Sequence, residues 1–220
     1  GARFLHISTD YVFGGDRARK RPLDEAAPPA PLNVYGASKL LGETLAGTVC
    51  EDLVILRVAS LFGVAGASGK GGNFVETMIR VGRERGVLRI VNDQFMSPTS
   101  SRDVAGVIMR MLMDPCDPGL YHVVNSGAAS WFEFASAIVK GAGVEAVVEP
   151  CSSADYPTRA ARPGYSVLDN AKVSMHYGIM PAWQDALERY LRAKGHRGGT
   201  GRFQQGRSGD TMNTQASGAS

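Results

Sequence analysis

Short apolar runs alternate with helix-like segments along this chain, and this alternation constrains its fold more than any other feature. The runs occupy residues 3–9, 53–58, 88–91 and 120–125, and the helical patterns cover residues 35–48, 73–85 and 101–113. Strands that alternate with helices usually pair in parallel, with helices on both faces of the sheet. The sequence therefore predicts an α/β fold with a doubly wound parallel sheet, in which the strand at 53–58 is buried on both faces.

Polar residues mark the starts of three predicted helices. Asn73 is a favourable N-cap, while Ser130 with Glu133 and Ser100 with Asp103 have the spacing of capping boxes. The helix that follows Ser100 carries three methionines, which we expect in the hydrophobic core: Met109, Met111 and Met113.

The chain is predicted to form one domain with a smaller lobe. Residues 1–195 contain the periodic segments, and the segments at 144–149 and 181–194 are expected to form a small C-terminal substrate-binding lobe. Residues 196–220 contain almost nothing apolar, so we predict a disordered tail there.

Composition narrows the classes of function. The chain has 220 residues, a net charge of +3 and no dense basic stripe, which argues against nucleic-acid binding. Its three cysteines lack metal-ligand spacing, so neither a zinc site nor a disulfide framework is expected, and a reducing cytoplasm fits. No apolar run reaches transmembrane length, so no membrane association is predicted.

A tyrosine and a lysine four residues apart, Tyr35 and Lys39, begin the helix that follows the first strand. This spacing places both side chains on one helix face, where an ammonium can stabilise a neighbouring phenolate. Such a tyrosine can act as an acid or base, and a hydroxyl at the end of the first strand could bind the substrate oxygen. The arrangement suits redox chemistry on a sugar carbonyl. The same spacing recurs at Tyr190 and Lys194, which we interpret as a surface pair.

An ordered series of motifs extends this pattern along the chain. The motifs are Ser8-Thr-Asp-Tyr-Val-Phe13, Asp24-Glu25, Tyr35-Gly-Ala-Ser-Lys39, Asn73-Phe-Val-Glu-Thr-Met78, Asp93-Gln94 with Pro98-Thr99, Ser130-Trp131 and Arg162-Pro163. Together they resemble those of the dTDP-4-dehydrorhamnose reductases, which belong to the extended short-chain dehydrogenase/reductase superfamily. The resemblance implies a Rossmann-like, NAD(P)-binding fold.

The resemblance also implies catalytic roles. NADPH or NADH would reduce a keto carbon while Tyr35 supplies the proton, Lys39 holds the ribose hydroxyls and Thr9 positions the carbonyl oxygen. Ser8 would contact the cofactor and is the alternative to Thr9. No metal-ligating residue is predicted, because the four histidines show no ligand pairing, and the sequence leaves metal dependence undecided.

A nucleotide-linked deoxy-sugar is the implied substrate. Its predicted binding residues are Asp10, Tyr11, Asn73, Gln94, Thr99 and Arg162. From the residues alone, Asp10 and Tyr11 could instead form a turn and a packed ring, and Asn73 could serve only as a helix cap. The Arg162 guanidinium suits a diphosphate, because its donors match phosphate oxygens.

Two departures from the family pattern limit these expectations. Ser60 stands where the reductases usually carry a tryptophan, so an aromatic ring that would stack on the sugar is absent. The substrate could therefore be a related deoxy-sugar or carry another nucleotide. The chain has no G-x-G-x-x-G turn. The resemblance implies that the first strands and this turn of a full-length relative are missing, so we expect the chain alone to be inactive and its preference for NADH or NADPH to be undecided.

Other functions stay open as alternatives. One is a sugar-nucleotide epimerase or dehydratase of the same superfamily, and another is a non-catalytic regulatory subunit such as the methionine adenosyltransferase beta subunit. A homodimer is an open alternative to a monomer.

Overall fold

The central sheet of the protein consists of three parallel strands. The computed structural model describes residues 2–16, 18–65, 72–115, 117–156 and 158–196. The strands lie in the order β1 (Phe4–Thr9), β2 (Leu53–Val58) and β7 (Gly119–His122), with Thr9 paired to Val58 at their carboxyl ends. Apart from His196, the tail predicted to be disordered lies outside the described residues.

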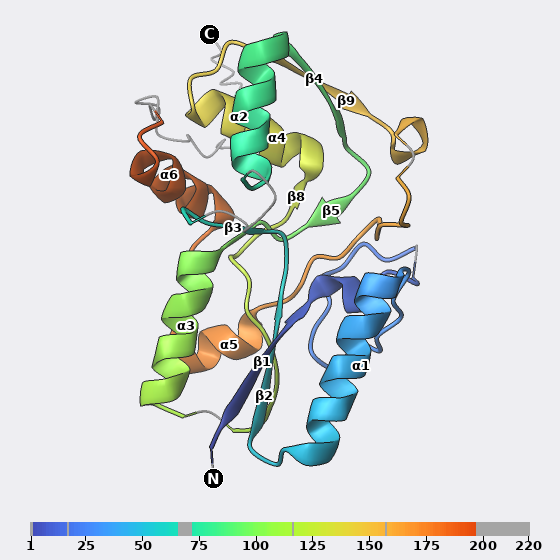
Figure 1. Ribbon diagram of the computed structural model, residues 1–220, viewed down its shortest axis with the longest axis vertical. Helices are drawn as coiled ribbons and strands as arrows, with labels where there is room; N and C mark the ends of the chain where they lie inside the picture. Colours follow the sequence, from blue (N-terminus) through green and yellow to red (C-terminus); the bar gives the residue numbers. More distant parts are fainter. Residues whose placement is uncertain (1, 17, 66–71, 116, 157, 197–220) are drawn as a thin grey trace, which may run out of the picture.

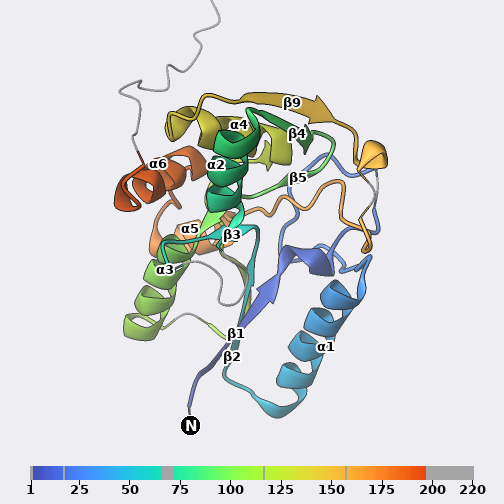
Figure 2. The same ribbon diagram turned by 45° about the horizontal axis from the view of Figure 1, so that its top comes forward.

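Helices cover both faces of this sheet, as Figure 1 and Figure 2 show. They are α1 (Val34–Val49) on one face and α3 (Ser101–Met113) with α5 (Ala171–Tyr177) on the other. Val54 and Leu56 of β2 pack with Val107 and Met111 of α3, while Arg57 of β2 faces α1. The predicted doubly wound α/β arrangement is confirmed, although α5 was not predicted.

A second hydrophobic core holds the smaller lobe together. The lobe consists of α2 (Phe74–Arg85), β4 (Val87–Val91), α4 (Trp131–Gly141), β9 (Val147–Cys151) and α6 (Trp183–Ala193). Strand β4 pairs in parallel with β9, so segments far apart in sequence build one unit (Figure 1). The lobe is therefore larger than predicted, because α2, β4 and α4 belong to it as well.

Short elements link the sheet to the lobe. They are η1 (Asp10–Val12), β3 (Leu61–Phe62), β5 (Phe95–Met96), β6 (Thr99–Ser100), β8 (Ala129–Ser130) and η2 (Ser153–Asp155). Strands β3 and β6 pair in parallel, whereas β5 and β8 pair antiparallel.

Two of the three predicted helix caps are confirmed. The Asn73 side chain accepts a hydrogen bond from the Glu76 amide, and Ser130 with Glu133 forms a full capping box. The prediction for Ser100 was wrong, because its side chain makes no capping hydrogen bond.

The expectation for the methionines of α3 was wrong for two of the three. Met111 is fully buried, but Met109 and Met113 are 56% and 81% exposed. Met109 and Met113 are four residues apart and share a helix face, while Met111, two residues from each, lies on the opposite side. The single buried position therefore follows from helical geometry.

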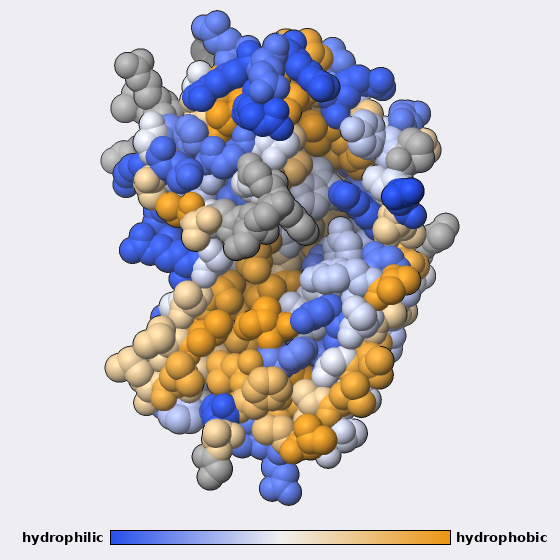
Figure 3. All heavy atoms as spheres, viewed as in Figure 1, coloured by the Kyte–Doolittle hydropathy of each residue, from blue (hydrophilic) through white to orange (hydrophobic). Residues whose placement is uncertain are grey.

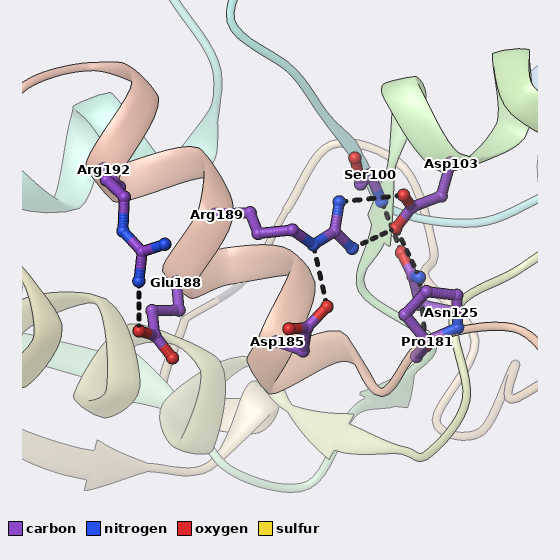
Figure 4. Close-up of polar contacts among 8 residues, drawn as sticks. All are labelled: Ser100, Asp103, Asn125, Pro181, Asp185, Glu188, Arg189 and Arg192. Atoms are coloured by element: carbon purple, nitrogen blue, oxygen red, sulfur yellow. Dashed lines mark hydrogen bonds and ion pairs between the residues drawn. The ribbon is translucent and has the colours of Figure 1, made fainter. Parts of the chain in front are cut away.

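Asp103 makes tertiary contacts in place of the predicted capping bond (Figure 4). Arg189 of α6 donates to both Asp103 oxygens at 2.9 and 2.8 Å, and the Asn125 amide donates to Oδ2 at 2.8 Å. The Asn125 side chain also accepts the Ser100 amide at 2.7 Å. This network fastens α6 to the first turn of α3 and raises the pKa of Arg189 through the Asp103 hydrogen bonds.

Apolar side chains remain exposed over the sheet half of the molecule, on the face that holds β1, α1 and α3 (Figure 3). Phe4 and Ile7 of the edge strand β1 are among them, as are Leu41 and Leu45 of α1. Within the described ranges, no helix is both long and apolar enough to cross a membrane.

Substituting Asp103→Ala should lower the free energy of unfolding by about 2 kcal/mol, because it removes a bidentate charged hydrogen bond and an acceptor for Asn125. Glu188→Ala is the matched control, since its ion pair with Arg192 on α6 is largely exposed, and it should cost at most about 0.5 kcal/mol. Urea unfolding followed by circular dichroism measures both. Equal losses would contradict the role given to Asp103.

Candidate active site at the end of strand β1

Three predicted site residues meet where β1 ends and η1 begins. The Thr9 side chain accepts a hydrogen bond from the Tyr11 amide at 3.2 Å and donates one to Asp10 Oδ1 at 3.1 Å. Thr9 and Asp10 are both buried, while Tyr11 is partly exposed. Polar side chains at the carboxyl end of a parallel strand are well placed to contact a ligand.

Helix α1 presents the tyrosine and the lysine beside this strand end. The Tyr11 and Tyr35 rings meet edge to face with centroids 5.9 Å apart, and Tyr35 is 55% exposed. The Lys39 ammonium donates to the Ile7 carbonyl oxygen of β1 at 2.6 Å. The structure thus places Thr9, Tyr35 and Lys39 beside the carboxyl end of β1, with Lys39 bound to the backbone of β1.

A glycine allows this close approach of α1 to η1. A Cβ built on Gly36 would lie 2.0 Å from the Tyr11 carbonyl oxygen, far closer than van der Waals contact permits. The Asn33 side chain accepts the Gly36 amide at 2.8 Å and begins the helix at this point. Gly36 therefore sets the position of Tyr35 relative to η1.

Gly36→Ala should displace the start of α1 and lower the free energy of unfolding by about 2 kcal/mol, since the methyl group has no room. Gly47→Ala serves as the control on the same helix, where a Cβ meets nothing within 4 Å. That variant should raise stability by about 0.5 to 1 kcal/mol, because alanine has the higher helix propensity. Thermal and urea unfolding test both, and a Gly36→Ala protein as stable as Gly47→Ala would refute the packing argument.

Ser8 has a structural partner. Its hydroxyl donates to Glu43 Oε1 of α1, and Glu43 in turn accepts Arg57 Nε at 2.9 Å and Nη2 at 2.7 Å. All three residues are buried. Ser8 is therefore engaged inside the fold, and this geometry does not support its predicted contact with the cofactor.

Asp10 is the most strongly perturbed carboxyl group of the site. It is 2% exposed, and Ser166 donates to its Oδ2 at 2.6 Å. Burial raises the pKa of Asp10 to about 6, against hydrogen bonds from Ser166 and Thr9 that favour the charged form. Burial also raises the pKa of Tyr11, and the Asp10 charge adds to that rise.

The pKa of His122 shifts in the opposite direction. Its ring is fully buried, with Nδ1 3.0 Å from the Leu23 carbonyl oxygen. Burial, together with the Arg57 charge, lowers the pKa of His122 to about 4. A histidine with a lowered pKa stabilises the fold fully above pH 6.5, and this contribution is lost as the pH falls toward 4.

Asp10 contributes to stability with the reverse dependence, because a carboxyl with a raised folded pKa favours the folded state at low pH and loses this effect as pH rises through about 6. Asp10→Asn removes that contribution. Between pH 7.5 and 4.5, the variant should therefore lose about 2 kcal/mol more unfolding free energy than wild type. Urea unfolding at the two pH values provides the measurement, and parallel losses in the two proteins would contradict the raised pKa.

The remaining predicted substrate residues differ in their accessibility. Arg162 is exposed and close enough to Tyr11 for its charge to lower that residue's pKa, so it borders the site. Gln94 is partly exposed, and its carbonyl accepts the Trp131 amide at 3.3 Å. Thr99 is fully buried, and its hydroxyl donates to the Ser97 carbonyl at 2.9 Å. The structure therefore does not present Thr99 to a ligand.

Both the oxygen and the nitrogen of the Asn73 side-chain amide form hydrogen bonds within the fold. Besides capping α2, it donates to the Gly63 carbonyl at 3.0 Å and to the Tyr190 hydroxyl at 3.1 Å. Tyr190 is 5% exposed and donates to Glu76, so the expectation that it lies on the surface was wrong. The face of α6 that carries Tyr190 packs in the hydrophobic core of the lobe.

Two features escaped the sequence reasoning. Ser166 contacts Asp10 from a position 156 residues away, and a local sequence pattern cannot predict such a contact. The sequence did indicate a buried partner for Arg57, since a charged residue within a buried strand requires one.

Ser60, which stands where the reductases usually carry a tryptophan, has a φ of 43°. Its carbonyl accepts a hydrogen bond from the Thr99 amide at 3.3 Å.

The parallel sheet, its flanking helices and the polar cluster at its carboxyl end define a Rossmann-like α/β protein. Comparison with protein families matches residues 1–195 to the RmlD substrate binding domain. The chain belongs to this family. A Bacillus subtilis protein named spore coat polysaccharide biosynthesis protein SpsK is 40% identical over 195 residues, covering 88% of this chain and 65% of that protein.

Named reductases are similar to the chain to the same degree. The dTDP-4-dehydrorhamnose reductase of Aggregatibacter actinomycetemcomitans is 39% identical, covering 84% of this chain and 64% of the relative. The crystal structure of the Bacillus anthracis dTDP-4-dehydrorhamnose reductase in complex with NADP superimposes with a TM-score of 0.79 at 39% identity, covering 87% of this chain and 66% of that one. The chain thus spans about two thirds of the length of these relatives.

Proposed function

We propose that this chain supplies the catalytic and substrate-binding residues of an NAD(P)H-dependent reductase. The reaction is reduction of the 4-keto group of a nucleotide-linked deoxy-sugar, dTDP-4-dehydro-L-rhamnose or a close relative. The observation that carries the proposal is the meeting of Thr9, Tyr35 and Lys39 at the end of β1. Relatives of 39% identity that are named for this reaction support it.

The donor set around β1 fits the nicotinamide ribose of a dinucleotide. The Lys39 ammonium is partly exposed and could exchange the Ile7 carbonyl for ribose hydroxyls, and the Tyr35 phenol is accessible beside it. NADP in the structure of the Bacillus anthracis relative favours NADPH as the cofactor, with NADH as the alternative. The bound cofactor would supply the hydride.

The chain's own residues would bind the substrate and deliver a proton. Thr9 would hold the keto oxygen by a hydrogen bond, and Tyr35 would donate the proton that converts this oxygen to a hydroxyl. Arg162 would contact the diphosphate, with Tyr11 and Gln94 bordering the sugar nucleotide. Asn73 and Thr99 would act through the fold. We place the protein in the cytoplasm, where nucleotide sugars for polysaccharide synthesis are made.

The alternatives predict different behaviour of the cofactor. A reductase consumes reduced cofactor in proportion to product, whereas an epimerase or dehydratase regenerates a tightly held cofactor in each cycle. A regulatory subunit would co-purify with a partner synthetase and would not depend on Tyr35. Ser60, where the reductases usually carry a tryptophan, leaves the identity of the sugar to be tested.

The decisive test uses the protein encoded by the full reading frame that contains this chain. Cofactor oxidation is followed on dTDP-4-dehydrorhamnose and on other 4-keto sugar nucleotides, for wild type and Tyr35→Phe. Loss of the proton donor should lower kcat by at least about 100-fold. Tyr156→Phe is the control, because Tyr156 is an exposed tyrosine that directly follows η2, and it should retain wild-type activity. Comparable activity in Tyr35→Phe and wild type would refute the assigned role.

A further inference from the structure

The buried carboxyl group of Asp10 joins two hydroxyl groups from distant parts of the chain. Its Oδ2 accepts Ser166 Oγ at 2.6 Å, and its Oδ1 accepts Thr9 Oγ1 at 3.1 Å. Ser166 is 3% exposed and Thr9 is 6% exposed. Among the residues that the structure describes, no ion pair reaches Asp10. The carboxyl group is therefore held by these two hydroxyls and by the backbone amides of Asp10 and Tyr11.

The Thr9 hydroxyl cannot donate a hydrogen bond to Asp10 and to a substrate keto oxygen at the same time. A hydroxyl has one hydrogen to donate, and in this structure Thr9 gives it to Asp10 while accepting the Tyr11 amide. A keto oxygen is only an acceptor, so it needs that same hydrogen. The hydrogen becomes free, without loss of the contact to Asp10, when the carboxyl is protonated and donates to Thr9.

The hydrogen bond from Ser166 determines which oxygen of Asp10 can carry this proton. Because the Ser166 hydroxyl donates to Oδ2, a proton on the carboxyl is placed on Oδ1, which faces Thr9. Burial raises the pKa of Asp10 to about 6, so the protonated form is accessible near neutral pH. Tyr11 is the titratable neighbour of Asp10, and Tyr35 and Arg162 lie within electrostatic reach of Tyr11.

Ser166 is itself fixed by the loop that carries predicted substrate residues. Its amide donates to the Phe95 carbonyl at 2.9 Å, and the Phe95 amide donates to the Gly164 carbonyl at 2.9 Å. Two residues further on, the Leu168 amide donates to Ser97 Oγ at 3.3 Å. The position of the Ser166 hydroxyl therefore depends on the same loop that presents Gln94.

We propose that Ser166 is a positioning residue for Thr9: by occupying Oδ2 of Asp10, it places the carboxyl proton on Oδ1 and directs the Thr9 hydrogen to the keto oxygen. The inference rests on the proposed reductase function. No net proton leaves Asp10 in this scheme, since Tyr35 supplies the proton that the product retains.

The test measures kcat and KM against pH for the protein encoded by the full reading frame. Ser166→Ala should lower kcat about tenfold and leave the KM for the nucleotide sugar within about twofold. Because the lost hydrogen bond favoured the charged carboxylate, the alkaline limb of the profile should move to higher pH. Ser166→Thr, which keeps the hydroxyl, should restore most of the activity.

Asp10→Asn gives an independent check that does not remove Ser166. With its oxygen accepting from Ser166, the amide nitrogen would donate to Thr9 and imitate the protonated acid. In this variant kcat should no longer fall at alkaline pH, because the amide does not titrate. An inactive but folded Asp10→Asn protein, or one whose kcat still falls at alkaline pH, would overturn the proposal.

A readout without turnover completes the test. Carbon-13 NMR titration of the aspartate carboxyls, assigned with Asp10→Asn, should show the Asp10 pKa rising in Ser166→Ala. If wild type is active and Ser166→Ala has the same kcat and pH profile, the role of Ser166 alone is overturned. The same holds if the Asp10 pKa does not rise in Ser166→Ala, or if Ser166→Thr does not restore the lost kcat. Wild type that consumes no reduced cofactor on any 4-keto sugar nucleotide would overturn the reductase function, and this role with it.

Discussion

The buried ion pair between Glu43 and Arg57 is the interaction on which the arrangement of the site depends. Removing two charges from water is unfavourable unless good geometry and further hydrogen bonds compensate. Here the contact is bidentate, Ser8 donates to the carboxylate, and the Arg57 guanidinium lies 4.9 Å from the centroid of the Phe13 ring. Because Glu43 belongs to α1 and Arg57 to β2, the pair fixes the helix that carries the candidate catalytic residues against the sheet.

The segment at 163–168 performs a comparable task between the sheet and the lobe. It has no regular secondary structure, yet Ser166, Val167 and Leu168 are all buried. Its backbone bonds to Leu23 beside the sheet and to Phe95 beside the lobe. The hydroxyl that reaches the site thus comes from the segment that contacts both the sheet and the lobe.

Local signals in the sequence predicted the parts of the fold that depend on local chemistry. The N-cap at Asn73 and the capping box at Ser130 use partners within three residues, and both are confirmed. Ser100 lacked its predicted box because Asp103 binds Arg189, which is 86 residues away. Tyr190 was misjudged since its burial depends on α2 and α4. The motif at the end of β1 located the candidate site, but the partners of its hydroxyls were set by tertiary packing.

The contact of Gly36 with the Tyr11 carbonyl has a consequence for the entropy of ligand binding. It holds the backbone at the start of α1 in place, while the adjacent Tyr35 ring remains 55% exposed. A ligand that engages this ring would have to order the side-chain torsions of one residue, at about 0.5 to 1.5 kcal/mol, with little further ordering of the main chain. The site therefore combines a fixed backbone at the start of α1 with an adjustable Tyr35 side chain.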